Sequence, residues 1–136
     1  MTSKSLLALD IGEKRIGVAL ADTAVRIAIA YDTIQVDGSE IESIARLVIN
    51  EQTDTIVVGY PRNQSGETTA QTAYVEKFSE KLTNLAPNIV FQDESLTSVI
   101  AEERLRARKA NFTKSDIDAE AAAIILQDYL EQNYAA

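Results

Sequence analysis

The first third of the chain has the short-period hydrophobic pattern of β-strands. Residues 4–11 (KSLLALDI) form an apolar run typical of a strand that is buried on both faces, and turn residues follow at positions 12–14. Residues 15–21 (RIGVALA) place large apolar side chains on one face and glycine or alanine on the other. A third strand is predicted around residues 27–36. Because these segments are joined directly, we expect three antiparallel strands.

The rest of the chain alternates between helical and strand patterns. A capping box at Ser39 and Glu42 predicts the start of a helix that extends to Asn50. Further helices are predicted over residues 68–85, 96–110 and about 115–133, and short apolar runs predict strands over residues 55–59 and 89–92. Strands that are linked through helices are usually parallel. The predicted fold is therefore α/β, with a five-stranded mixed sheet of three antiparallel and then two parallel strands, flanked by helices on both faces.

Length and composition limit the architecture and the compartment. A chain of 136 residues with 46% hydrophobic and 25% charged residues can bury one core, so we expect a single domain over residues 1–136. The first apolar run is too short for a signal peptide or a membrane span, which predicts a cytoplasmic protein without a membrane partner. The net charge of −8 excludes mechanisms that need a wholly basic surface, so nucleic-acid binding requires a local basic patch.

The side-chain inventory restricts the chemistry to oxygen ligands. The sequence contains no Cys and no His, which excludes disulfides, zinc sites of the usual kind, thiol nucleophiles and Ser-His catalytic pairs. A metal ion would have to be bound by carboxylates, carbonyl groups and water. Mg²⁺ and Mn²⁺ suit such ligands.

Three carboxylates are candidate metal ligands and catalytic residues: Asp10, Glu94 and Asp118. Each follows a predicted strand or opens a predicted helix, and each also has a structural explanation, as a turn cap or as an acid at a helix start. If the three converge, their mutual repulsion requires a cation. Two divalent ions about 4 Å apart could then activate a water and stabilise the leaving oxygen of a phosphodiester.

Basic residues near these acids are candidate phosphate contacts. Lys14, Arg15 and Arg62 lie in loops or turns beside the proposed site. The segment from residue 104 to residue 114 has five basic residues and no acid, and its alternative explanation is a solvated helix end. The predicted nucleic-acid-binding residues are Lys14, Arg15, Arg62, Arg104, Arg108 and Lys109.

Four motifs together resemble one known family. They are residues 9–19 (LDIGEKRIGVA), residues 57–63 (VVGYPRN) with Gly66, residues 93–98 (DESLTS), and the helix from Asp118 to residue 127. In this order and spacing they are similar to the YqgF family of small bacterial RNase H-like proteins, which are described as candidate pre-16S rRNA nucleases and as Holliday-junction-resolvase-like. The resemblance covers nearly the whole chain.

The resemblance implies an RNase H-like fold and a metal-dependent phosphodiesterase site. Asp10 matches the acid of the family's first strand, Glu94 the acid of its D-E-x-L-T-[ST] motif, and Asp118 the acid that opens its last helix. Asp93 is the weaker ligand candidate. The family usually has Arg after the Asp-Glu pair, whereas this chain has Ser95. That difference affects one phosphate or structural contact and not the three acids.

We therefore expect a nuclease that hydrolyses RNA phosphodiester bonds with two Mg²⁺ or Mn²⁺ ions. The resemblance implies a role in 5′-end maturation of pre-16S rRNA in ribosome biogenesis, with pre-rRNA as partner and a monomer or weak homodimer as the assembly. One alternative is a Holliday-junction DNA resolvase, which predicts a stable dimer with a continuous basic surface. Another is a non-catalytic module that binds RNA or the ribosome. A phosphotransferase of the sugar-kinase type would need two such domains.

Overall fold

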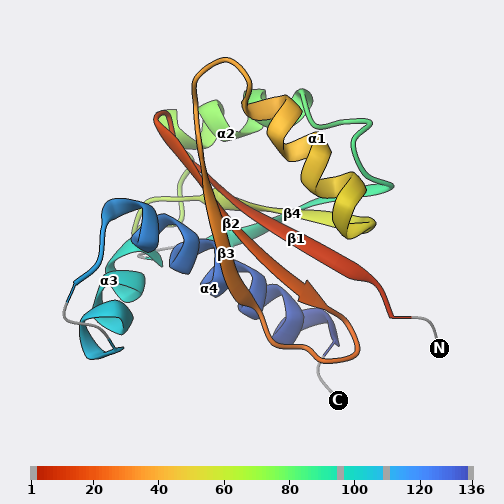
Figure 1. Cartoon of the computed structure of the whole chain (residues 1–136). Coiled ribbons are helices and arrows are strands. Elements are labelled where there is room, and N and C mark those ends of the chain that lie inside the picture. The colour runs from red at the N-terminus through yellow and green to blue at the C-terminus, as the bar shows by residue number, and fades with distance from the viewer. Residues whose placement is uncertain (1–2, 95–96, 109–110, 135–136) are drawn as a thin grey trace.

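The computed structural model describes residues 3–94, 97–108 and 111–134, which form five strands and four helices (Figure 1). In chain order these are β1 (Ser5–Ile11), β2 (Arg15–Asp22), β3 (Ile29–Gln35), α1 (Glu40–Glu51), β4 (Thr53–Pro61), α2 (Ala70–Glu80), β5 (Asn88–Glu94), α3 (Thr97–Arg108) and α4 (Lys114–Tyr134). Every element follows the predicted order, and most ends lie within two residues of the predicted ones.

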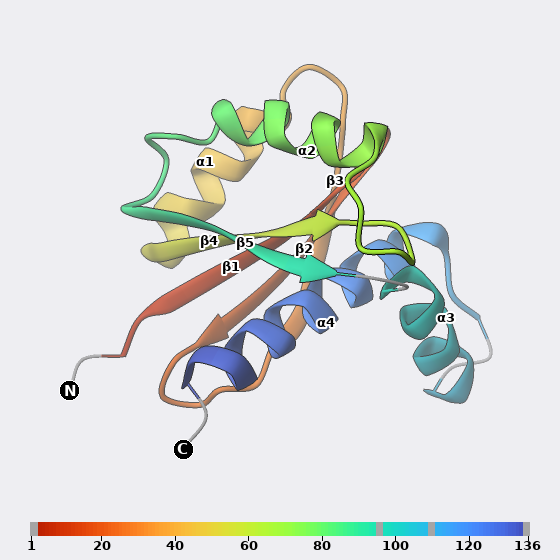
Figure 2. The same cartoon turned by 180° about the vertical axis from the view of Figure 1, so that it is seen from behind.

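The five strands form one mixed sheet in the order β3-β2-β1-β4-β5. β1 pairs with β2 and β2 with β3 in antiparallel fashion, whereas β1 with β4 and β4 with β5 are parallel pairs. The prediction of three antiparallel strands followed by two parallel ones is confirmed. Helices α1 and α2 cover one face of this sheet and α4 covers the other, while α3 lies beside the first half of α4 (Figures 1 and 2).

Alternation along β1 divides the hydrophobic core between the two faces. Leu7 and Leu9 belong to the cluster on the side of α1 and α2, whereas Leu6 and Ala8 pack against the alanine-rich and apolar side of α4. Because side chains alternate along a strand, the next residue on the α4 side is Asp10. β1 is therefore buried on both faces, as predicted, and it directs a carboxylate toward the last helix.

Two helix ends differ from the sequence-based expectation. Ser39 precedes α1, but its hydroxyl donates to Asp37 Oδ1 at 2.7 Å and makes no capping bond to the helix, so the predicted capping box is wrong. A capping box is present instead at α2, where Thr69 and Thr72 bond each other's backbone N–H groups. α2 ends at Glu80 and not at residue 85, and the turn that follows still buries Leu82.

No helix among the described residues is long and apolar enough to cross a membrane.

Candidate active site

Two of the predicted acids lie at the same edge of the sheet. Asp10 is near the carboxyl end of β1, and Glu94 is the last residue of β5. β1, β4 and β5 are parallel, so their carboxyl ends meet at one edge, and Figure 2 shows β4 and β5 pointing toward α3. Ligands of open α/β sheets gather beyond such ends. Parallel pairing thus brings together two residues that are 84 positions apart in the sequence.

The third acid reaches this edge because a glycine lets α4 approach the sheet. Gly17 of β2 lies opposite Asp10 in the β1–β2 ladder. A Cβ atom at Gly17 would overlap the backbone carbonyl of Asp118 in α4, so only glycine permits this approach. Sequence analysis noted Gly17 only as a small residue on its strand face. The structure shows that it brings Asp118 beside Asp10.

A second glycine makes room for Glu94. Gly59 lies in β4, between β1 and β5, and a Cβ atom there would lie 3.1 Å from Glu94 Oε2 and 2.6 Å from Ile125 Cδ1. Gly59 therefore leaves the space that the Glu94 carboxylate and the α4 side chain share. The sequence marks this position with a glycine at the end of the apolar run of residues 55–59 (TIVVG). From the hydrophobic pattern, Gly59 was interpreted as the end of a strand and not as space for a neighbouring side chain.

The electrostatics of Asp10 report the proximity of the three acids. Burial at the strand end and the negative charges of Glu94 and Asp118 raise the pKa of Asp10 from 3.8 to about 8. Burial also raises the pKa of Glu94, and a hydrogen bond of 2.9 Å from Thr97 Oγ1 to Glu94 Oε2 opposes that increase. The protein therefore holds a cluster of carboxylates that repel one another unless a proton or a cation compensates them.

The carboxylate oxygens of Asp10, Glu94 and Asp118 are ligands of the kind that a hard divalent cation takes. Carboxylate oxygens are the ligands that Mg²⁺ and Mn²⁺ prefer. Among residues 3–94, 97–108 and 111–134, no three acidic side chains already converge on a common ion position. Asp118 Oδ2 accepts a hydrogen bond from Arg15 Nε at 2.6 Å. The metal-binding and catalytic roles of the three acids stay predictions.

A cleft opens next to Glu94. It has a volume of about 490 Å³ and lies between the loop after β4 and the helices α3 and α4. The residues that line it include Arg62, Asn63, Glu94, Thr97, Ile124 and Asp128. This volume falls within the usual range of small-molecule sites, about 300–1,000 Å³. The cleft is therefore large enough to hold a small ligand against Glu94.

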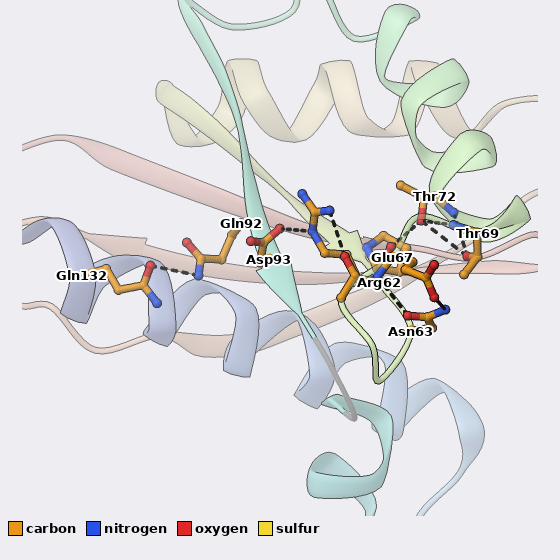
Figure 3. Close-up of polar contacts among 10 residues, drawn as sticks. Arg62, Asn63, Glu67, Thr69, Thr72, Gln92, Asp93 and Gln132 are labelled. Atoms are coloured by element: carbon orange, nitrogen blue, oxygen red, sulfur yellow. Dashed lines mark hydrogen bonds and ion pairs between the residues drawn. The ribbon is translucent and has the colours of Figure 1, made fainter.

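Arg62 stands at the rim of this cleft and is held by several groups (Figure 3). Its Nε donates to Asp93 Oδ1 at 3.0 Å, its Nη1 donates to the carbonyl of Gly66 at 3.3 Å, and its guanidinium lies 4.8 Å from the centre of the Tyr60 ring. The hydrogen bond that Arg62 donates to Asp93 raises the pKa of Arg62. Asp93 thus pairs with an arginine at the surface, and its ranking as the weaker metal ligand stays a prediction.

The loop that carries Arg62 is ordered by its own polar groups. Asn63 Oδ1 accepts hydrogen bonds from the backbone N–H groups of Ser65 and Glu67, at 3.0 and 2.9 Å. Thr72 at the start of α2 donates its hydroxyl to the carbonyl of Pro61 at the end of β4. These bonds, drawn partly in Figure 3, fix the loop between β4 and α2 beside the acids.

The other predicted phosphate contacts are distributed unevenly. Lys14 is exposed in the β1–β2 turn. Arg104 and Arg108 both pair with Glu120 of α4, at 3.5 and 2.5 Å, and the Glu120 side chain is only 9% exposed. The run of cations without an acid in the local sequence is therefore partly neutralised by a distant carboxylate. Lys109 lies outside the described residues.

Comparison with known proteins places the chain among relatives over nearly its full length. The RuvX family, described as Holliday junction resolvase, matches residues 4–132. The "Putative pre-16S rRNA nuclease" of Chloroflexus aurantiacus is 43% identical over 136 residues, covering 96% of this chain and 89% of the relative. A protein of the same name from Sulfurihydrogenibium sp. is 39% identical over 130 residues, covering 93% and 90%.

A solved structure supports the same assignment at the level of the fold. Thermus thermophilus RuvC in complex with a Holliday junction substrate matches with a TM-score of 0.57 and 12% identity, covering 95% of this chain and 94% of that one. RuvC has the RNase H-like fold, and the sheet order described above agrees with it. The chain therefore belongs to the RuvX (YqgF) family, a family of nucleases with the RNase H-like fold.

Proposed function

We propose that this chain is a metal-dependent nuclease that hydrolyses RNA phosphodiester bonds, with residues 1–136 acting as one RNase H-like domain. The observation that carries the proposal is that the half-buried Asp10 lies close enough to Glu94 and Asp118, at the carboxyl edge of the sheet, for their charges to raise its pKa. An RNA-binding module gains nothing from neighbouring carboxylates that repel phosphate, whereas a two-metal site requires them.

Each residue of the edge has a part in this mechanism. Asp10, Glu94 and Asp118 would hold two Mg²⁺ or Mn²⁺ ions, which lower the pKa of the attacking water and stabilise the leaving oxygen. The hydrogen bond from Thr97 keeps Glu94 oriented toward the site. Arg62 and Lys14 flank the edge and are suited to contact phosphates on either side of the scissile bond. No protein nucleophile or histidine base is needed.

The names of the relatives support pre-16S rRNA as the substrate of this chain, with 5′-end maturation in ribosome biogenesis as the biological role and the cytoplasm as its location. The second candidate is Holliday-junction resolution, which the family description and the likeness to RuvC favour. The two candidates share the acids but differ in assembly, because symmetric cleavage of a junction needs two sites in a stable dimer.

Cleavage assays distinguish these candidates. Labelled single-stranded RNA, an RNA duplex and a four-way DNA junction are incubated with Mn²⁺, Mg²⁺ or chelator, and the wild type is compared with Asp10→Asn. Glu42→Gln is the matched control, because it removes an exposed acid from α1 on the opposite face of the sheet. We expect metal-dependent RNA cleavage by the wild type and Glu42→Gln, with a loss of at least about 100-fold in Asp10→Asn.

Other outcomes would replace the proposal. Selective paired nicks in the junction would assign the chain to the resolvase function. RNA binding without cleavage above the Asp10→Asn background, for every metal, would assign it to the non-catalytic module.

A further inference from the structure

Asp118 already has a cation beside it in the protein. Arg15 Nε lies 2.6 Å from Asp118 Oδ2, and the two side chains are only 28% and 22% exposed. The other arginine pairs near the edge involve different acids, since Arg62 pairs with Asp93, and Arg104 and Arg108 pair with Glu120. Arg15 is thus the arginine paired with a predicted metal ligand.

The backbone of Arg15 is fixed against Gly12, just beyond the end of β1. Arg15 opens β2 directly after the β1–β2 turn, and its carbonyl accepts a hydrogen bond of 3.0 Å from the N–H of Gly12. A Cβ atom at Gly12 would lie 2.7 Å from that carbonyl oxygen, so the turn holds Arg15 close to the end of β1. The guanidinium is therefore presented to Asp118 by a rigid element and not by a mobile loop.

The pair has a clear consequence for metal binding. A carboxylate oxygen that accepts a short, charge-assisted hydrogen bond is less available to a divalent ion. The same guanidinium also repels a second cation at close range.

We propose that Arg15 is a positioning residue that competes with divalent metal for Asp118: it pairs with the carboxylate while metal is absent and is displaced when metal binds. This inference rests on the proposed function, since it takes Asp118 as a metal ligand. The displaced guanidinium is then free at the edge where a substrate phosphate would lie. Arg15 acts on metal binding through Asp118.

Metal affinity distinguishes competition from a purely structural role. Binding of Mn²⁺ is measured by electron paramagnetic resonance of the free ion for the wild type, Arg15→Gln, Arg15→Lys and Arg46→Gln. Arg46 is the matched control, because its exposed pair with Glu42 on α1 loses the same charge far from the site. We expect Arg15→Gln to bind Mn²⁺ roughly tenfold more tightly, and Arg15→Lys and Arg46→Gln to stay within about threefold of the wild type.

A measurement on the wild type avoids any dependence on the folding of a variant. The Arg15 Nε–Hε signal in a ¹⁵N spectrum is assigned by its absence from Arg15→Lys and is followed during titration with Mg²⁺. We expect this signal to move from a strongly hydrogen-bonded position to a solvent-like one, in step with metal occupancy.

The possible failures are separable. Unchanged or weaker Mn²⁺ binding by Arg15→Gln, or an Nε–Hε signal that stays fixed while Mg²⁺ saturates, would overturn the competition and leave the metal site intact. No metal binding by either the wild type or Arg15→Gln would overturn both this inference and the proposed metal-dependent function.

Discussion

Gly17 and Gly59 set the distance between the sheet and the last helix. A Cβ atom added at Gly17 would overlap the backbone of Asp118. A Cβ atom added at Gly59 would instead meet the ends of the Ile125 and Glu94 side chains. Backbone cannot rotate away from an overlap, but a terminal methyl group can. The two glycines are therefore needed for different reasons, although each lies in a buried strand on the same face as Asp10.

This difference predicts unequal costs of two matched substitutions. Gly17→Ala should lower the free energy of unfolding by about 3 kcal/mol, because α4 must move as a unit, and Gly59→Ala by about 1 kcal/mol. Urea denaturation of both variants measures the two values. Equal losses, or a larger loss for Gly59→Ala, would contradict the close approach of α4 at Gly17.

The buried charge of Asp10 predicts a pH-dependent stability of the metal-free protein. The folded-state pKa is about 8 and the ordinary value is 3.8, so the folded protein holds a proton that the unfolded chain releases. The free energy of unfolding should thus be highest below about pH 4 for this group and fall as pH rises toward 8.

Asp10→Asn removes this titration. In the presence of chelator we expect the stability advantage of Asp10→Asn over the wild type to increase by at least about 1 kcal/mol from pH 5 to pH 8, given about 1.4 kcal/mol per pKa unit. Thermal unfolding at several pH values measures the difference, with Glu42→Gln as the control. A constant difference across this range would rule out a perturbed Asp10.

Polar contacts with carboxylates hold helix α3 in place near its first residue and along its second half. Its first residue, Thr97, donates to Glu94, and its second half is tied to α4 through Arg104, Arg108 and Glu120. Ala101 and Leu105 supply its buried apolar contacts. With so few apolar anchors, the position of α3 over the site depends strongly on the nearly buried Glu120.

Glu120→Gln should therefore loosen α3 without unfolding the sheet. We expect a loss of about 1–3 kcal/mol in global stability and faster hydrogen–deuterium exchange confined to residues 97–108. Glu102→Gln is the control, because the pair of Glu102 with Arg106 lies within α3 and is exposed. Unchanged exchange in α3 for Glu120→Gln would contradict this anchoring role.

Local pattern was sufficient to predict the elements, their order and the mixed sheet, because alternation and helical spacing report burial directly. The shared edge of Asp10 and Glu94 is a consequence of the predicted parallel pairing, although the sequence alone left the convergence of the acids open. The Glu120 pairs and the Gly17 contact could not be predicted, since each joins segments that are distant in sequence and depends on how α4 lies across the sheet. The Ser39 prediction failed because Asp37 competes for its hydroxyl.

The whole molecule is acidic, yet the proposed substrate is a polyanion. With 13 basic and 21 acidic residues, long-range electrostatics oppose RNA, and Arg104 and Arg108 are already paired. We expect the attraction to come from the edge that carries the exposed Lys14, the rim residue Arg62 and the proposed metal ions. RNA binding should therefore depend on divalent cations far more than for a basic RNA-binding protein.

This dependence can be measured directly. At constant ionic strength we expect RNA affinity, followed by fluorescence anisotropy, to be at least about tenfold higher with Ca²⁺ than with chelator, because Ca²⁺ also prefers oxygen ligands. Asp10→Asn with Glu94→Gln should lose most of this gain, whereas Glu42→Gln should keep it. Equal affinity with and without the ion would indicate that RNA binds elsewhere on the surface.

The order in which the elements are synthesised determines when the three acids can come together. α4 is the last element, and it supplies both Asp118 and the cover for Leu6, Ala8 and Val57. A nascent chain that stops before residue 114 has two of the three acids but exposes one apolar face of its sheet. Domains fold as synthesis proceeds, so the site can form only after the last helix has docked. The three acids can therefore come together only once residues 114–134 have been synthesised and have packed on the sheet.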